Sequence, residues 1–370
     1  MDFKTAYSTK PNIAEAVAEL KTEFSDFDAK AIMYFASTIY EPAALSKTIC
    51  DAFPNTITFG CTTAGELVTG KMLDQSIVAM AFSPKILGDI KVVVTENIKN
   101  DKRAIDRAFA SFQAHFGKTA SDLDHNKYVG IALLDGMSGM EEKLIERIGD
   151  LTNISFVGGS VGDDLQFKAT YVFMEGKAYT NAAVLAILKP KTQFSILKTQ
   201  SFKLSGKKLT VTKAIEAERR VIEFDNQPAT IAYSQALGIE PVKLSEFMFE
   251  HPVGLMDFKG EPFVRSPRVV EGTDVLFYCA INKGFELDIL ESRDIVEDTK
   301  ADLEAKINEM VGISAIINFH CILRTLELKQ KQQTQAYADI FGDIPNIGFS
   351  TYGECYIGHI NQTSTMLVFK

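Results

Sequence analysis

The sequence lacks clustered basic residues. Its 39 Lys and Arg are outnumbered by 48 Asp and Glu, and the formal net charge is −9 at pH 7. A surface that binds duplex DNA or RNA needs grouped Lys and Arg to neutralise the phosphates. Because no such group is present, we expect no nucleic-acid partner.

Long apolar runs are missing as well. The longest, such as AAVLAIL at 182–188, have the length of a strand, whereas a helix that spans a bilayer needs roughly 20 apolar residues. The first residues, MDFKTAYSTKPN, are polar and lack the basic and apolar segments of a secretory signal. These features predict a cytoplasmic protein without a membrane span.

Patterns that bind metals or form disulfides are scarce. No Cys-x-x-Cys pair occurs, which favours reduced thiols in a cytoplasm over a disulfide framework. His359 stands four residues after a cysteine, but zinc needs three or four convergent ligands and no second pair follows. We therefore expect no metal. The five cysteines are Cys50, Cys61, Cys279, Cys321 and Cys355.

Motifs for nucleotide binding and nucleophilic catalysis are missing too. The glycine-flanked stretch 60–67 lacks the lysine of a phosphate-binding loop, and 158–162 does not have the Gly-x-Gly-x-x-Gly spacing. Cys61 could act as a nucleophile if a histidine lay near it in space. No Gly-x-Ser-x-Gly or papain-like context surrounds it. The sequence favours a protein that is not an enzyme, with a cysteine-dependent enzyme left as an alternative.

Three segments, 30–83, 127–189 and 314–370, share one order of elements. Each contains an apolar strand, an amphipathic helix, a second apolar strand, a glycine turn and a further strand. The strands are continuous apolar runs, as expected where both faces of a sheet are covered. The pattern predicts an α/β protein of two lobes of mixed β-sheet with flanking helices, built from repeated strand–helix–strand–Gly-turn–strand units.

Each unit carries one polar turn of the pattern Ser/Thr-x-Gly-Asp/Glu where its second strand ends. Glycine permits a positive φ or a close approach, and the hydroxyl and the acid can hold turn amides. One such turn alone would be an ordinary chain reversal. Three copies at strand ends, where ligand sites of α/β proteins gather, favour a shared pocket. The expected ligand contacts are Cys61, Thr62, Thr63, Glu66, Gly159, Ser160, Asp163, Thr351, Tyr352 and Glu354.

A single cation, Arg324, follows the first strand of the third unit. A charge at the end of an apolar strand costs free energy unless it is paired. Arg324 therefore forms a structural salt bridge, for example with Glu354, or its planar guanidinium clamps a ligand carboxylate. In the second case Glu354, Asp163 or Glu66 would accept a ligand ammonium, which is what an amino-acid site requires. Both interpretations stay open.

The stretch between the second and third units has a different composition. From about residue 190 it is rich in Lys, Ser and Thr, and a short strand, an Asp-Asn-Gln-Pro turn and a helix follow. We place a domain boundary near residue 225, which predicts domains 1–225 and 226–370.

Several of these motifs resemble the FIST family over nearly the whole chain. GCTTAGEL, GGSVGDD and TKAIEAERRVIEFDNQPA resemble its FIST N region, and FHCILR, GFSTYGEC and HINQTS resemble its FIST C region. The most specific part is the turn at 351–354 followed by His359, Asn361 and Thr363. The Gln-rich helix after Arg324 departs from the family pattern, but it affects a helix face and not the turn.

The resemblance implies a sensory, small-ligand-binding module of bacterial signal transduction. It implies an amino acid or a similar small polar metabolite as the ligand, bound in a cleft between the lobes, and it adds Asn361 to the expected contacts. Because no output domain is visible in the sequence, it also implies a separate histidine kinase, cyclase or chemotaxis protein as the signalling partner.

Haem is the one cofactor that the resemblance leaves open. Some relatives are haem-binding nitric-oxide sensors, and haem needs an axial ligand in an apolar pocket. His115, His251, His320 and His359 are candidates among which the sequence does not choose. We expect no cofactor, with the haem sensor as an alternative.

Overall fold

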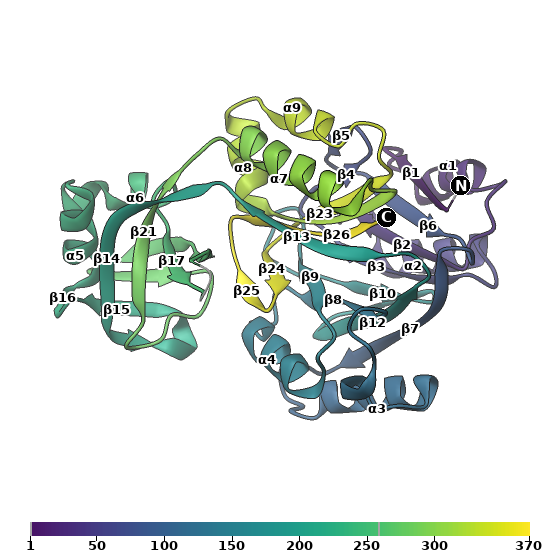
Figure 1. Cartoon of the computed structure of the whole chain (residues 1–370), viewed down its shortest axis with the longest axis horizontal. Coiled ribbons are helices and arrows are strands. Elements are labelled where there is room, and N and C mark those ends of the chain that lie inside the picture. Colours follow the sequence, from purple (N-terminus) through teal and green to yellow (C-terminus); the bar gives the residue numbers. More distant parts are fainter. Residues whose placement is uncertain (1, 258–259) are drawn as a thin grey trace.

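The computed structural model of the chain describes residues 2–257 and 260–370 and consists of a large body and a smaller lobe (Figure 1). The body holds three six-stranded sheets, with helices around its periphery, and the smaller lobe holds a fourth sheet. Parallel and antiparallel pairings occur in the same sheets of the body. The predicted α/β class with mixed sheets and flanking helices is confirmed.

The body is built from three units with the same order of elements: an edge strand, a helix, a strand, a second helix, a strand, a short hairpin and a returning strand. The elements of the first unit are β1 (Phe3–Ser8), α1 (Ile13–Glu23), β2 (Ala31–Ala36), α2 (Pro42–Ala52), β3 (Ile57–Thr62), β4 (Glu66–Val68), β5 (Lys71–Leu73) and β6 (Ile77–Phe82).

The second and third units repeat this order, with one helical segment split in the third. The second unit contains β7 (Leu87–Glu96), α3 (Ala104–Phe116), β8 (Val129–Asp135), α4 (Glu141–Leu151), β9 (Phe156–Val161), β10 (Val172–Met174), β11 (Lys177–Tyr179) and β12 (Ala182–Pro190). The third contains β13 (Phe194–Gln200), α7 (Ile295–Met310), β22 (Ala315–Cys321), α8 (Ile322–Gln330), α9 (Thr334–Asp339), β23 (Asn346–Thr351), β24 (Gly353–Tyr356), β25 (Gly358–Ile360) and β26 (Thr363–Phe369).

The hairpin of each unit leaves its own sheet and joins the sheet of another unit. The hairpin β10–β11 pairs with β3, the hairpin β24–β25 with β9, and the hairpin β4–β5 with β23. The three sheets therefore have equivalent strand orders, β1-β6-β2-β3-β10-β11, β7-β12-β8-β9-β24-β25 and β13-β26-β22-β23-β4-β5. This exchange links the three units into a closed ring.

Composition and caps explain the local elements. The strands β2, β6, β8, β22 and β26 are buried at every position, which fits their continuous apolar runs. Helices α1, α2 and α7 begin after side chains that accept amide hydrogens, which are Asn12, Glu41 and Asp294. In the part of the chain that the structure describes, each helix is too short or too polar to cross a bilayer.

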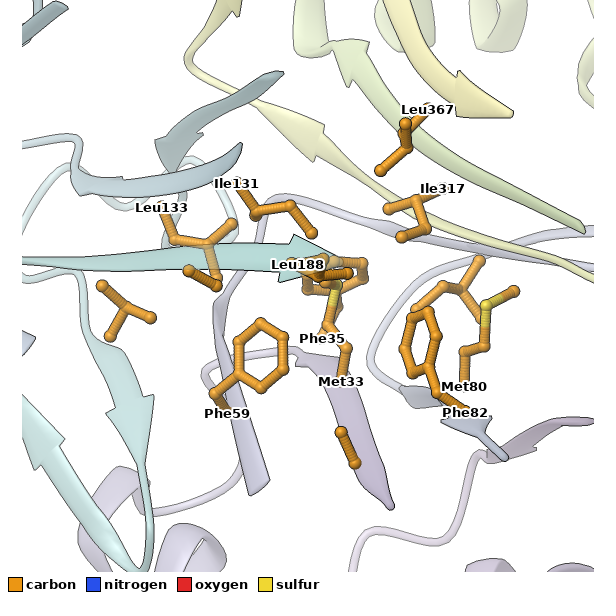
Figure 2. Packing of buried hydrophobic residues seen from close by; sticks show 14 of the residues in the cluster. Met33, Phe35, Phe59, Met80, Phe82, Ile131, Leu133, Leu188, Ile317 and Leu367 are labelled. Carbon is orange, nitrogen blue, oxygen red and sulfur yellow. The ribbon is translucent and has the colours of Figure 1, made fainter. Parts of the chain in front are cut away.

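One apolar core lies where the three sheets meet. Phe35 of the first unit, Ile131 of the second and Leu367 of the third belong to the same buried cluster (Figure 2). The rings of Phe35 and Phe349 are 4.7 Å apart between centroids. Because truncating a buried phenylalanine to alanine typically costs about 3–5 kcal/mol, this shared core binds the units firmly to one another.

One glycine in each of the strands β3, β9 and β23 shows how the three units correspond. At these positions a Cβ would lie within about 2 Å of a carbonyl oxygen on the neighbouring parallel strand, so only glycine fits. When these glycines are aligned, Ser160 corresponds to Thr62 and Ser350. The Ser/Thr-x-Gly-acid pattern instead pairs Ser160 with Thr63 and Thr351, which are one residue further along the chain. The glycines and their register partners are Gly60 with Tyr34, Gly158 with Ala132, and Gly348 with Asn318.

The smaller lobe is an insertion between β13 and α7, where the other two units have short loops. It has its own apolar core. The boundary predicted near residue 225 falls between β15 and β16, two paired strands of this lobe. Its elements are β14 (Phe202–Ile215), β15 (Arg220–Phe224), β16 (Gln227–Pro228), α5 (Ala229–Leu237), α6 (Leu244–Phe247), β17 (Val253–Met256), β18 (Pro262–Arg265), β19 (Pro267–Glu271), β20 (Asp274–Phe277) and β21 (Glu286–Ser292).

Candidate functional site

The three turns that follow strands β3, β9 and β23 lie against one another. The Ser350 amide donates to the Gly65 carbonyl at 2.8 Å, and the Asp164 amide donates to the Thr63 carbonyl at 2.9 Å. The Tyr352 amide donates to Ser160, also at 2.9 Å. Backbone hydrogen bonds thus hold the three turns together at the centre of the ring.

The first and third turns are built on the same buried carboxylate arrangement. Glu354 accepts hydrogen bonds from the Thr351 hydroxyl at 2.8 Å and from the Thr363 hydroxyl at 2.7 Å. Glu66 accepts equivalent bonds from Thr63 and Ser76. Burial raises the pKa of Glu66 to about 8 and that of Glu354 to about 7, although the hydroxyl donors act in the opposite direction. Each carboxylate ties its turn to the start of the returning strand.

The second turn is expanded into a longer loop between β9 and β10. The Asp163 carboxylate accepts hydrogen bonds from the Phe167 amide at 2.9 Å, from the Lys168 amide at 2.6 Å and from the Tyr352 hydroxyl at 2.5 Å. Asp164, Leu165 and Phe167 all have positive φ. Non-glycine residues in this conformation cost about 1–3 kcal/mol each and cluster at ligand sites. The loop is held in one strained shape.

This loop, the third turn, helix α8 and the smaller lobe enclose a cleft of about 700 Å³. A volume of about 300–1,000 Å³ is usual for a small-molecule site. The body supplies most of the lining, and the smaller lobe supplies Arg219, Arg268 and Tyr278. The lining residues from the body are Gly136, Met137, Gly139, Glu141, Leu165, Phe167, Ile322, Leu323, Leu326, Tyr352 and His359.

Apolar and aromatic side chains form most of the cleft wall. The rings of Phe167 and Tyr352 stack with centroids 5.0 Å apart and planes at 23°. Phe167 remains 54% exposed, which is high for a phenylalanine held in a fixed loop. Leu323 and Leu326 of α8 contribute the other apolar wall.

An ion-pair cluster of Glu141, Glu142 and Arg219 joins the body to the smaller lobe beside the cleft. Arg219 Nη2 lies 2.9 Å from Glu141 Oε2 and 2.6 Å from Glu142 Oε2, and its Nη1 donates to the Tyr278 carbonyl at 2.7 Å. Burial by itself would raise the pKa of Glu142, but the Arg219 guanidinium and, at the acidic pH where this carboxyl titrates, a protonated His359 hold it below its usual range. The cluster fixes these charges before any ligand arrives.

His359 lines the cleft as a buried imidazole, 3% exposed. Its Nδ1 is fully buried and has no hydrogen-bond partner among the described residues. Burial lowers its pKa, so the ring is neutral at physiological pH. A Cβ at Gly353 would lie 2.1 Å from His359 Cε1, so the glycine makes room for the ring.

Arg268 lies exposed on β19 at the cleft. Within residues 2–257 and 260–370 its side chain takes part in no ion pair or hydrogen bond. The other arginine of the lining, Arg219, is already paired. Arg268 is therefore the available positive charge of the cleft.

Three of the residues predicted from the turns bear on the cleft. Tyr352 lines it, Asp163 holds the Tyr352 hydroxyl, and Ser160 donates to Glu141 of the ion-pair cluster at 3.3 Å. Gly159 lies under Thr351, since a Cβ there would be 2.6 Å from Thr351 Cγ2. Residues of the second and third turns therefore line or support the cleft, whereas those of the first turn do not.

The predicted residues of the first turn lie inside the body. Cys61 belongs to the common core, and the Thr62 hydroxyl accepts from the Tyr171 amide at 2.9 Å. Thr63 and Glu66 form their carboxylate arrangement beside a separate hollow of about 300 Å³. These residues do not line the cleft between the lobes, and neither do Thr351 and Glu354.

Arg324 and Asn361 occupy two further buried places. Arg324 Nη1 donates to the Ser201 hydroxyl at 3.3 Å and Nη2 donates to the Thr299 hydroxyl at 2.7 Å. The described residues contain no ion pair between Arg324 and Glu354. Asn361 Oδ1 accepts from the Cys279 thiol at 2.8 Å. Arg324 therefore contacts Ser201, in one connection to the smaller lobe, and Thr299 of helix α7, and it does not line the cleft.

Sequence reasoning missed most of the lining. DGMSGMEE at 135–142 follows a buried strand and ends in two acids at a helix start, a signal that could have drawn attention to Glu141. No local pattern marks Phe167 or Arg268, because their roles depend on a loop conformation and on the placement of the inserted lobe.

Fold and cleft together define a two-lobed α/β protein with a cleft at the junction of the lobes. The chain belongs to the FIST family: the FIST N domain matches residues 30–227 and the FIST C domain matches residues 229–356. FIST domains are sensory domains of signal-transduction proteins. The family resemblance expected from the sequence motifs is confirmed.

A more distant similarity links the chain to an uncharacterized protein of Methanocaldococcus jannaschii. The two are 25% identical over 273 residues, which is 68% of this chain and 50% of that protein. The chain thus spans about half the length of this curated relative.

Proposed function

We propose that the chain senses a small molecule by binding it, without chemical conversion, in the cleft between the lobes. The observation that carries this proposal is the cleft itself, where a stacked aromatic pair, a buried imidazole and a fixed ion-pair cluster surround about 700 Å³. Apolar walls with a few positioned polar groups are the usual composition of such sites.

Binding fits this lining better than nucleophilic catalysis does. The cleft residues include no Ser, Thr, Cys or Lys. Cys61, the candidate nucleophile, is buried in the core, and burial raises the pKa of its thiol well above the usual range. A thiol that stays protonated is a poor nucleophile.

The position of the cleft suggests how binding becomes a signal. A ligand that contacts both lobes stabilises the arrangement in which they face each other. Ser201 and Arg293, in the two connections, are joined by a 2.8 Å backbone hydrogen bond, so the chain enters and leaves the smaller lobe side by side (Figure 1). We propose that a separate cytoplasmic kinase, cyclase or chemotaxis protein reads this arrangement.

A second candidate, a haem sensor, is favoured by His359. Among the four histidines considered, His359 lines the apolar cleft, whereas His320 bonds Tyr337, His115 bonds Asp89 and His251 lies near the Leu290 carbonyl. Its neutral imidazole would be a suitable ligand for a haem iron, and Arg268 could pair with a propionate. A Soret band retained through gel filtration and lost in His359→Ala would favour this candidate. A colourless protein that takes up no haem would reject it.

The binding proposal is tested by a metabolite screen that records thermal stability. A ligand present at about 100 times its Kd should add roughly 2.7 kcal/mol of stability. Phe167→Ala should clearly reduce this stabilisation, because it removes the exposed ring of the cleft. Leu204→Ala is the matched control, since Leu204 is similarly exposed (50%) but lies outside the lining. Equal stabilisation of the wild type and Phe167→Ala by every hit would place the site elsewhere.

A further inference from the structure

We infer that the cleft takes an aromatic carboxylate: a flat ring against Phe167, Tyr352 and helix α8, with its carboxylate on Arg268. This inference rests on the proposed function, since it names the class of ligand for the same cleft. It differs from the small polar metabolite expected from the sequence resemblance.

The apolar wall argues for a ring. Phe167 keeps more than half of its surface exposed, and Met137, Leu165 and Leu326 of the same lining are also partly exposed. Asp163 and the positive φ of Phe167 hold this ring in place. A small polar ligand would leave these side chains in contact with water, whereas a flat ring would cover them. Offset stacking on such a platform is a favourable geometry for aromatic rings.

The charges argue for a carboxylate. Among the charged residues that line the cleft, Glu141 and Arg219 face each other at 2.9 Å and the His359 imidazole is neutral, so Arg268 is the cation of this lining without an ion-pair partner among the described residues. A guanidinium matches a carboxylate through two parallel hydrogen bonds. Since Arg268 belongs to the smaller lobe and the aromatic platform to the body, a ligand of this class would bridge the two lobes.

An α-amino group on the ligand is compatible with the same site. Glu141 and Glu142 together carry one more charge than Arg219 neutralises. The carboxylates accept from Ser160 and from the Ala280 amide, and they retain some capacity for an ammonium. An aromatic acid and an aromatic amino acid therefore share the recognised chemistry, and direct comparison separates them.

The test is isothermal titration of the full chain with 3-phenylpropionate, phenylalanine, serine and glutamine. We expect at least one of the two aromatic compounds to bind, and both polar amino acids to bind at least tenfold more weakly. Arg268→Gln and Phe167→Ala should each weaken the aromatic ligand by about 10- to 100-fold, the range for losing a charge-assisted hydrogen bond or a stacking partner. Arg103→Gln, which removes an exposed arginine outside the lining, should leave the affinity unchanged.

The outcomes separate this inference from the proposed function. If serine or glutamine binds more tightly than both aromatic compounds and Phe167→Ala weakens that binding, the cleft is the site but the ligand class is wrong. If an aromatic compound binds and neither Arg268→Gln nor Phe167→Ala weakens it, the assigned contacts are wrong. If no compound in the titrations or in the metabolite screen binds the cleft, the inference and the proposed function both fail.

Discussion

At the scale of single residues, the polar groups of the turns are mostly structural, and their burial decides this. Glu66 and Glu354 have the residue types of a ligand site, and each accepts hydroxyl hydrogen bonds from both ends of one hairpin. Beside the cleft, His359 has a buried ring nitrogen without a hydrogen-bond partner and Arg268 has no ion-pair partner among the described residues. Whether a polar residue supports the fold or can contact a ligand therefore depends on where it lies relative to the two lobes.

Gly353→Ala should destabilise the protein by about 1–3 kcal/mol, because the added methyl group overlaps the buried His359 ring. Gly358→Ala in the same hairpin is the control, since a Cβ there has no heavy atom within 4 Å. Urea unfolding of both variants measures the difference. Equal stability of the two would show that the ring moves aside without cost.

Glu354→Gln should flatten the pH dependence of stability. Burial raises the pKa of Glu354 in the folded state to about 7 from its ordinary value of 4.5, so the folded state binds a proton more tightly than the unfolded state. The free energy of unfolding therefore falls as pH rises from about 4.5 through about 7 because of this group. Unfolding curves at pH 5, 6.5 and 8 would check this. An unchanged slope in the variant would mean that Glu354 ionises freely in the fold.

At the scale of elements, helix α8 has two roles on two faces. Ile322, Leu323 and Leu326 line the cleft. Arg324 donates to Ser201, in one connection to the smaller lobe, and to Thr299 of α7, the helix that follows the other connection. A shift of this helix on ligand binding would act directly on those connections. The helix thus links the ligand site to the attachment of the smaller lobe.

Arg324→Ala should lower the free energy of unfolding by about 2–4 kcal/mol, since it leaves a cavity and two unpaired buried hydroxyls. Ligand affinity should stay within about threefold of the wild type, because Arg324 is outside the lining. Lys329→Ala on the same helix removes an exposed ion pair with Asp74 and should cost about 0–1 kcal/mol. A large loss of affinity in Arg324→Ala with stability intact would restore the interpretation of Arg324 as a ligand clamp.

The elements themselves could be predicted from the sequence, but their partners could not. Continuous apolar strands and glycine turns such as 62–66 report on local conformation, and the structure has strands and turns there. Nothing local indicates that β4 pairs with β23, or that Arg268 and Phe167 share a cleft, because these contacts join residues far apart in sequence. Of the residues predicted for a pocket at the turns, Tyr352 lies in the lining of the cleft and Asp163 and Ser160 lie behind it, whereas the residues of the opposite wall carry no pattern that would have marked them.

At the scale of the whole molecule, the smaller lobe is an insertion that adds no strand to the three sheets of the body. The three sheets of the body exchange hairpins only among themselves. The chain leaves and re-enters the body at Ser201 and Arg293, whose backbones are hydrogen-bonded at 2.8 Å.

Replacing residues 202–292 by a short loop should therefore leave a body that still unfolds cooperatively. It should lose ligand binding entirely, because Arg219, Arg268 and Tyr278 leave with the lobe. Circular dichroism during denaturation and isothermal titration measure the two properties. A truncated chain that is unfolded would show that contacts such as Arg219 with Glu141 are needed for the body itself.

The exchanged hairpins also bear on how the chain can mature on the ribosome. Strand β4 begins at Glu66, but its partner β23 begins at Asn346 and emerges only near the end of synthesis. The edge of β9 likewise stays unpaired until β24, which begins at Gly353, has been synthesised. Until then the nascent chain carries unpaired sheet edges, at which strands of other chains can pair and cause aggregation. Such a protein gains its final shape in a late step, and it is most exposed to aggregation and most in need of chaperones just before release.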